Sequence, residues 1–188
     1  MTSIRHRVGF QAAGDDDRDG QPVVLDDVEQ EEVIEDLRQS NRQTTARALL
    51  LLDVVLAFSA LLQLVYLLKD SKTSPLLALF PTAAPEPNLP FPTAFALLAL
   101  ALHANLALHL HPTLLSRSPL PIPYSLSYPL AAIDPTLNVF LRHSWQAVAW
   151  AAVPAAVVGL THSVHSTLQE GDEALVQLET LKYRAPGP

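Results

Sequence analysis

A long apolar segment at residues 48–68 constrains this chain more than any other feature of its sequence. Its 21 residues, ALLLLDVVLAFSALLQLVYLL, contain one charged side chain, Asp53, and one amide, Gln63. A helix of about 20 apolar residues crosses the hydrocarbon core of a bilayer. An unpaired carboxylate is costly in lipid, so Asp53 needs a partner or a place near the membrane surface. The segment therefore predicts an integral membrane protein.

Two further segments have the length and composition of membrane spans. Residues 93–110 carry no formal charge, and residues 145–161 are apolar apart from a polar start, with Pro154 inside. Proline and glycine are tolerated in membrane helices because neighbouring groups satisfy the freed backbone. We therefore expect an all-α integral membrane protein with about three transmembrane helices, at 48–68, 93–110 and 145–161, within a membrane domain at 48–164.

The flanking segments are polar and differ in expected order. Residues 1–25 are charged and rich in turn formers, which predicts a disordered acidic tail. Residues 26–47 have acids early and arginines late, which favours a solvent-facing helix that either stops at the first span or continues into it. Residues 165–188 predict a C-terminal amphipathic helix and tail. The proline-rich connections 69–92 and 111–144 are expected to be extended or turning, because proline removes a backbone donor.

Composition excludes several classes of function. The net charge is −7, and 11 of the 19 acidic residues precede Ala48, so no basic surface for nucleic acid is expected. Cysteine is absent, which excludes disulfides and thiolate chemistry. The chain has no glycine-rich phosphate loop, nucleophile elbow or HExxH motif. We therefore expect a protein that is not an enzyme and holds no cofactor.

The number of spans assigns the histidines to sides of the membrane. Three spans put the two termini on opposite sides, with His109, His111 and His143 on the N-terminal side and His162 and His165 on the other. A single site that uses all of them is then excluded. Five Lys and Arg residues near the membrane on the N-terminal side, against four on the other, favour a cytosolic N-terminus.

Three polar residues are expected to lie at a similar depth in the membrane. Asp53 lies five residues inside the start of the first span, and Asn105 lies five residues inside the end of the second. His109 is one turn further along the same helix face as Asn105. We expect Asp53 to accept hydrogen bonds from Asn105 or His109, either as a structural lock or as part of a proton relay or ion site. Gln63 and His103 are further candidates.

The pair His162 and His165 has a spacing that could bind a metal. Protein metal sites need three or four ligands, and the nearest further candidates are Glu170 and Asp172. Because no third ligand is compelling, we expect no metal site. An isolated histidine such as His103 is more often hydrogen-bonded to a backbone group or a neighbouring subunit.

These observations favour a non-catalytic accessory, adaptor or assembly subunit of an endomembrane complex, with the endoplasmic reticulum favoured. Its expected partners are the lipid bilayer and other membrane protein subunits, and not nucleic acid. The alternative is an oligomeric transporter or channel component for protons, ions or small solutes. A lipid enzyme that uses histidine is a third reading, supported only by the number of histidines.

Overall fold

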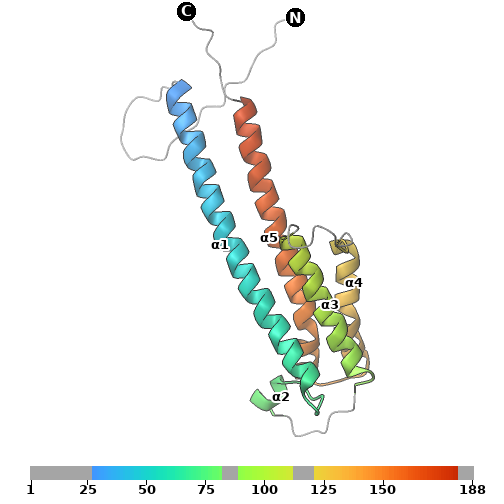
Figure 1. Cartoon of the computed structure of the whole chain (residues 1–188). Helices are drawn as coiled ribbons and strands as arrows, with labels where there is room; N and C mark the ends of the chain where they lie inside the picture. Colours follow the sequence, from blue (N-terminus) through green and yellow to red (C-terminus); the bar gives the residue numbers. More distant parts are fainter. Residues whose placement is uncertain (1–26, 82–88, 112–120, 182–188) are drawn as a thin grey trace, which may run out of the picture. The chain divides into compact units, whose positions relative to one another are not determined.

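Most of the residues that the structure, a computed structural model, describes are helical. The described residues are 27–81, 89–111 and 121–181, and no strand occurs among them. The helices are α1 (Asp27–Leu68), α2 (Leu76–Leu79), α3 (Pro92–Leu110), α4 (Tyr124–Phe140) and α5 (Trp145–Leu181) (Figure 1). The prediction of an all-α chain is confirmed. The expected disordered tail at 1–25 and the last residues of the C-terminal tail lie outside the described residues.

Three of these helices are long and apolar enough to cross a membrane, as predicted. They are α1, α3 and α5, and each contains one of the expected spans. The flanking helices are not separate elements, however. Residues 27–47 continue into the first span within α1, and the expected C-terminal helix is the last part of α5. Neither boundary, at residues 43–50 or at residues 160–170, contains a proline or glycine that would favour a helix end.

The described chain divides into two compact units. The first, which we call the flank unit, contains residues 27–42 of α1 and 171–181 of α5. The second, the bundle unit, contains residues 43–170. Both ends of the helical sequence therefore contribute to one unit.

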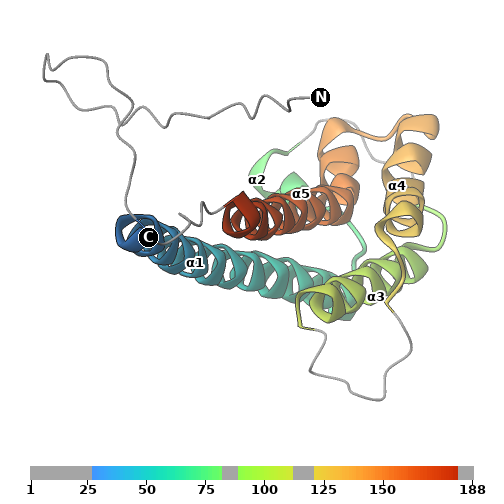
Figure 2. The ribbon, with the colours of Figure 1, turned by 90° about the horizontal axis from the view of Figure 1, so that it is seen from above.

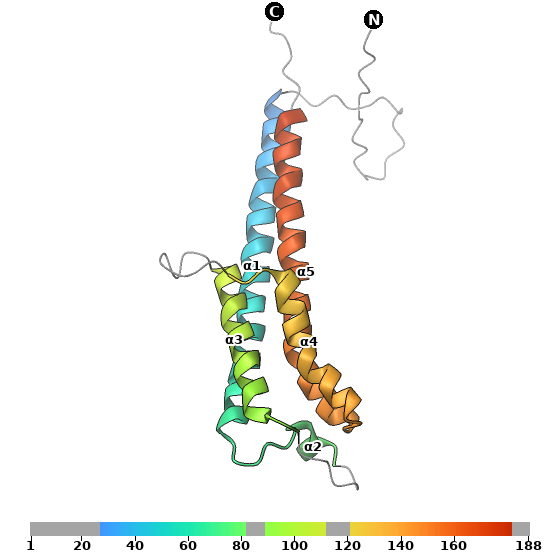
Figure 3. The same ribbon diagram turned by 90° about the vertical axis from the view of Figure 1, so that its right-hand side faces the viewer.

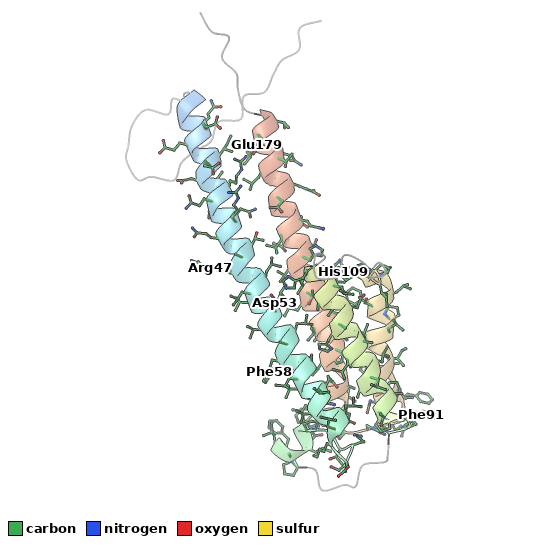
Figure 4. The ribbon with its side chains drawn as sticks, viewed as in Figure 1. Arg47, Asp53, Phe58, Phe91, His109 and Glu179 are labelled. Carbon is green, nitrogen blue, oxygen red and sulfur yellow. The ribbon has the colours of Figure 1, made fainter. Side chains whose placement is uncertain are left out.

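Polar contacts join the two helical segments of the flank unit. The guanidinium of Arg38 donates to Glu35 one turn earlier, at 2.7 Å, and to Glu179 of α5 (labelled in Figure 4). Hydrogen bonds to these two carboxylates raise the pKa of Arg38 above its ordinary value. Asn41 Nδ2 donates to Asp172 Oδ1 at 2.7 Å. These contacts are exposed to solvent, which screens charges, so each adds little to stability.

The bundle unit packs four helices around one apolar core. Leu56 of α1, Leu106 of α3, Ala131 of α4 and Val158 of α5 are all buried and belong to one cluster. Figure 3 shows α3 and α4 running in opposite directions, and the view from above in Figure 2 places them near each other. Each of the four helices therefore contributes an inward apolar face.

The helix α4 replaces a segment that the sequence analysis expects to be extended. Tyr124–Phe140 is helical although Pro129 and Pro135 lie inside it. Each proline removes one helical hydrogen bond, but packing of one helix face against a neighbour can stabilise a helix beyond its local propensity. Asn138 Nδ2 donates to the backbone oxygen of Asp134 at 2.9 Å, an added contact within the last turns. Tertiary packing therefore outweighs the local proline signal.

Large apolar side chains on the outward side of α1 are exposed. The inward side of the same helix repeats at spacings of four and three residues and includes Leu52, Leu56, Ser59, Gln63 and Tyr66. Phe58 is 61% exposed and is turned away from α3 and α5 in Figure 4. In water such a face would be unfavourable, whereas in a bilayer it contacts lipid. The members of this outward face are Leu50, Leu51, Val54, Phe58, Leu61, Val65 and Leu68.

A Schellman turn ends α4 and leads directly into α5. The N–H of His143 donates to the Asn138 carbonyl at 3.0 Å, and the N–H of Arg142 donates to the Val139 carbonyl at 3.0 Å. Arg142 occupies the left-handed position of this turn, with φ of 56°. Glycine is the usual residue there, because a side chain costs energy in the left-handed region.

Arg142→Gly is therefore expected to stabilise the bundle. Relief of the left-handed strain, reduced by the greater chain entropy of glycine when unfolded, should raise the free energy of unfolding by about 0.5–1 kcal/mol. Unfolding in a titration with SDS, followed by circular dichroism, measures the change. The control is Leu141→Gly at φ of −79°, where glycine brings no relief and should lower stability. Equal effects of both substitutions would contradict the assignment of strain to Arg142.

Candidate functional site

Asp53 lies on α1 and pairs with a histidine that directly follows α3. His111 Nε2 donates to Asp53 Oδ1 at 2.9 Å and to Oδ2 at 3.0 Å. Both side chains are partly exposed, at 38% for His111 and 42% for Asp53. The predicted contact of Asp53 with Asn105 or His109 is therefore corrected. The partner is one residue beyond the helix, where the chain leaves the regular helical positions and can reach across to α1.

Asn105 and His109 instead hold the chain just before α4. The N–H of Ile122 donates to Asn105 Oδ1 at 2.7 Å, and Asn105 Nδ2 donates to the Ile122 carbonyl at 3.0 Å. His109 Nε2 donates to the same carbonyl at 2.8 Å. Asn105 is buried and also lies 3.3 Å from Ser127 Oγ of α4. The two residues share one backbone target, as their positions one turn apart allow, and they tie α3 to α4.

His103 is buried in the middle of α3 and contacts α1. Its Nδ1 donates to the Ala99 carbonyl at 2.6 Å, so its Nε2 accepts from the Ser59 hydroxyl at 2.8 Å. Gln63, one turn beyond Ser59 on the inward face of α1, is only 3% exposed. Both residues that the sequence marks as further polar candidates therefore lie inside the bundle and not toward lipid.

A cluster of aromatic and imidazole rings joins α3, α4 and α5. The Tyr124 ring stacks on His109 and on His162, with 4.5 Å between the ring centroids in each case. The Tyr124 hydroxyl lies 3.3 Å from His165 Nδ1, and the Tyr128 hydroxyl lies 2.9 Å from His162 Nδ1. Figure 4 marks His109 near the end of α3. We call His109, Tyr124, Tyr128, His162 and His165 the ring cluster.

The ring cluster corrects the assignment of histidines to opposite sides. His109 and His162, expected on different sides of the membrane, both stack on the ring of Tyr124. The cause is α4, which adds a helix between α3 and α5 and reverses the direction in which α5 runs. Among residues 27–81, 89–111 and 121–181, no three His, Cys, Asp or Glu side chains form a group that could hold a metal ion.

A second polar network lies at the start of α5. Ser74 Oγ donates to the Gln146 backbone oxygen at 3.2 Å, and Gln146 Nε2 donates to the Phe80 carbonyl at 3.1 Å. The rings of Phe80 and Trp145 also meet, at 5.6 Å between centroids. The start of α5 is therefore fixed to the segment that follows α1.

His143 belongs to the end of α4 and not to the His109 group. Its Nδ1 lies 2.9 Å from Asn138 Oδ1, and Asn138 Nδ2 donates to Asp134 Oδ1 at 2.8 Å. Asn138 is 2% exposed. The carboxylate, amide and imidazole therefore form one chain of hydrogen bonds at the turn between α4 and α5.

The sequence did not predict a role in these contacts for Tyr124, Tyr128, Ser127 and Asn138, because their segment was expected to be an extended connection. One signal was present. Tyr124 and Tyr128 are four residues apart, as are Asp134 and Asn138, and this spacing places each pair on one helix face. An apolar connection with polar residues at helical spacing is typical of a buried helix.

Comparisons with known proteins do not assign the chain to a group. No protein-family model, no curated protein and no solved structure matches it.

Proposed function

We propose that this chain is a non-catalytic multi-pass membrane protein that serves as an accessory or assembly subunit of an endomembrane complex. The observation that carries the proposal is the use of its intramembrane polar groups. At the contacts between neighbouring helices they bond to one another or to backbone atoms. Such contacts orient helices and stabilise a bundle.

Polar pairs join three pairs of neighbouring segments in the bundle unit. Ser59 and His103 join α1 to α3 at 2.8 Å, and Asn105 joins α3 to the chain before α4. Tyr128 and His162 join α4 to α5 at 2.9 Å. A membrane protein whose polar side chains form hydrogen bonds between its own helices is suited to a structural role. This pattern supports a structural role more than a conducting one.

The flank unit supplies the features of a partner surface. Its helices are polar, yet Val33 is 46% exposed, Leu37 is 43% exposed and Val176 is 60% exposed. Exposed apolar side chains within a polar helical surface are typical of helix-to-helix docking. We propose that other membrane protein subunits bind here, while the outward face of α1 contacts lipid.

Purification of the tagged full-length chain in mild detergent, followed by mass spectrometry, tests this proposal. We expect a defined set of membrane proteins to co-purify with the wild type. Val33→Glu combined with Leu37→Glu should remove them while the bundle remains folded by circular dichroism. The matched control is Glu32→Gln, an exposed neighbour outside the apolar pair. A chain that purifies alone as one homogeneous oligomer would contradict the subunit proposal.

A transport component remains the second candidate, and one observation favours it. The inward face of α1 carries the buried residues Ser59, Gln63 and Tyr66, which follow the partly exposed Asp53 along the helix. A line of polar groups along one helix is what a path for protons or small solutes needs. Here Asp53 would lie at the mouth of the path.

Asp53→Asn separates the two candidates. If Asp53 only pairs with His111, loss of this partly exposed contact should lower the free energy of unfolding by at most about 1 kcal/mol and leave cell function nearly intact. Complementation in cells, with protein level and assembly measured in parallel, is the readout. Asp70→Asn, an exposed acid after α1, is the control. Loss of function at normal level and assembly would instead favour the transport component.

We further propose an endomembrane location, in the endoplasmic reticulum, with a cytosolic N-terminus. The support for the orientation is the group of arginines before the first span, Arg38, Arg42 and Arg47. Fluorescence microscopy of the tagged chain with organelle markers tests the location. Protease accessibility of an N-terminal tag in sealed microsomes tests the orientation.

A further inference from the structure

The two ends of the helical sequence meet in one unit, which constrains the number of membrane crossings. Arg38 pairs with Glu179, and Asn41 pairs with Asp172 at 2.7 Å. Charged and amide groups that bond to each other in this way lie on the same side of a membrane. The chain between them must therefore cross an even number of times. Three helices are apolar enough to be recognised as spans by composition, so one crossing is missing.

We propose that α4 is the fourth membrane-spanning helix and that its outward apolar face contacts the lipid chains of the bilayer. This inference does not depend on the proposed role as a subunit. It places both termini on one side of the membrane, contrary to the arrangement expected from three spans. We assign this contact to lipid because large apolar side chains are exposed on α4 and also on α1, α3 and α5.

The ends of α4 lie at opposite ends of the bundle unit. Its start is tied to the end of α3, because Ile122 bonds to Asn105 and to His109. Its end leads through four residues, 141–144, into α5, whose first turn bonds to the segment between α1 and α3 through Ser74. Since α3 runs from one of these ends to the other, α4 returns over the same depth, as Figure 3 shows.

The length of α4 agrees with a crossing. Its 17 residues extend about 25 Å at 1.5 Å per residue, against about 28 Å for the 19 residues of α3. Seventeen residues is the lower limit of the usual spanning range of about 17–25 residues. The connection at 141–144 is a short helix-to-helix turn, and such turns place the two helices side by side and antiparallel.

The side chains of α4 are arranged for lipid and not for water. Ser127 is 0% exposed and Asn138 is 2% exposed, whereas Ile133 is 45% exposed and Phe140 is 80% exposed. A helix at a water surface would show the reverse pattern. Its exposed serine and threonine, Ser125 and Thr136, have short hydroxyls that can bond within the helix. Large apolar residues are exposed likewise on the other helices: Phe58 on α1, Leu97 on α3 and Leu160 on α5.

The distribution of basic residues supports the four-span arrangement. It moves Arg142 to the side opposite the N-terminus and moves Lys182 and Arg184 to the N-terminal side. The N-terminal side then carries six Lys and Arg residues and the other side three: Arg38, Arg42, Arg47, Arg117, Lys182 and Arg184 against Lys69, Lys72 and Arg142. An excess of this size is typical of a cytosolic side, whereas three spans gave five against four.

The absence of cysteine allows a direct test by single-cysteine labelling of the full chain. The variants Glu32→Cys, Ser71→Cys, Arg142→Cys and Glu173→Cys place one thiol at an exposed position in each relevant segment. Sealed vesicles of one orientation are treated with a membrane-impermeant maleimide, and detergent-solubilised samples define full labelling. Leu141→Cys replaces Arg142→Cys if the latter does not label in detergent.

Four crossings predict that Glu32→Cys and Glu173→Cys label from one side and that Ser71→Cys and Arg142→Cys label from the other. Labelling of Arg142→Cys from the side of Glu32→Cys would overturn the proposal, as would labelling of Glu173→Cys from the side of Ser71→Cys. Three crossings predict both of these results.

A spin label on the outward face provides an independent measure of lipid contact. Ile133→Cys, labelled with a nitroxide in lipid nanodiscs, should collide more often with oxygen, which dissolves in lipid, than with a water-soluble nickel complex. The lipid-facing control is Phe58→Cys on α1, and the water-facing control is Glu32→Cys. A collision pattern for Ile133→Cys that matches Glu32→Cys would place α4 in water and overturn the proposal.

Discussion

Asn105→Leu is expected to destabilise the bundle unit strongly. The substitution preserves approximate size and does not lower helix propensity. It removes the acceptor of the Ile122 N–H at 2.7 Å and a donor to the Ile122 carbonyl at 3.0 Å. A buried backbone group that loses its partner costs about 1–3 kcal/mol. Since the N–H loses its acceptor, we expect a loss of about 2 kcal/mol in the free energy of unfolding.

Unfolding by SDS in mixed micelles, followed by circular dichroism, measures this loss. The matched control is Ala104→Leu, on the exposed side of α3 one residue earlier, which should change stability by less than about 0.5 kcal/mol. His109→Leu removes the second donor to the same carbonyl at 2.8 Å, so the double variant should not show the sum of the single effects. Additive effects would contradict the sharing of the Ile122 carbonyl by Asn105 and His109. Equal losses for Asn105→Leu and Ala104→Leu would contradict the stabilising role of the contact between Asn105 and Ile122.

Leu106→Ala is expected to have an effect of at least the same size. Leu106 is 1% exposed and packs in the cluster that contains residues of α1, α3, α4 and α5. Removal of a buried leucine side chain costs about 2–5 kcal/mol in water-soluble proteins because a cavity remains. In a bilayer the unfolded helix stays in lipid, so lost packing dominates and we expect about 2–3 kcal/mol.

The same unfolding measurement, with Leu97→Ala as control, checks the second prediction. Leu97 lies on α3 with 54% exposure, so its truncation removes lipid contact and little packing. We expect Leu97→Ala to change the free energy of unfolding by less than about 0.5 kcal/mol. If both truncations cost the same, the core assigned to the bundle unit would be wrong.

The sequence predicted elements whose signal is local. The span at 48–68 and the later spans follow from runs of apolar residues, because the cost of placing each residue in lipid depends mainly on that residue and its depth. The same reasoning failed for α4. Pro129, Pro135 and Asp134 reduce the local signal, and packing against α3 and α5 stabilises the helix there.

The pairing of polar residues was less predictable. Depth alone predicted that Asp53 lies level with the end of the second span. Its partner in the structure, His111, is two residues past the predicted partner His109. Depth could not decide which side chain turns toward α1. That choice depends on helix rotation and on where the chain leaves the helix. The prediction that His162 and His109 lie on opposite sides of the membrane was wrong for a different reason. It did not include α4, and an added helix between the two residues reverses the direction of α5.

By itself, the sequence determined that the chain is helical, that three segments are apolar enough to enter a membrane, and that no common catalytic motif is present. These properties depend on local hydrophobicity, backbone propensity and residue types. The tertiary structure decided that α4 is a helix, that Asp53 meets His111, and that Tyr124 is held between His109 and His162. These depend on contacts between residues far apart in the chain, whose energy appears only when the helices are packed together.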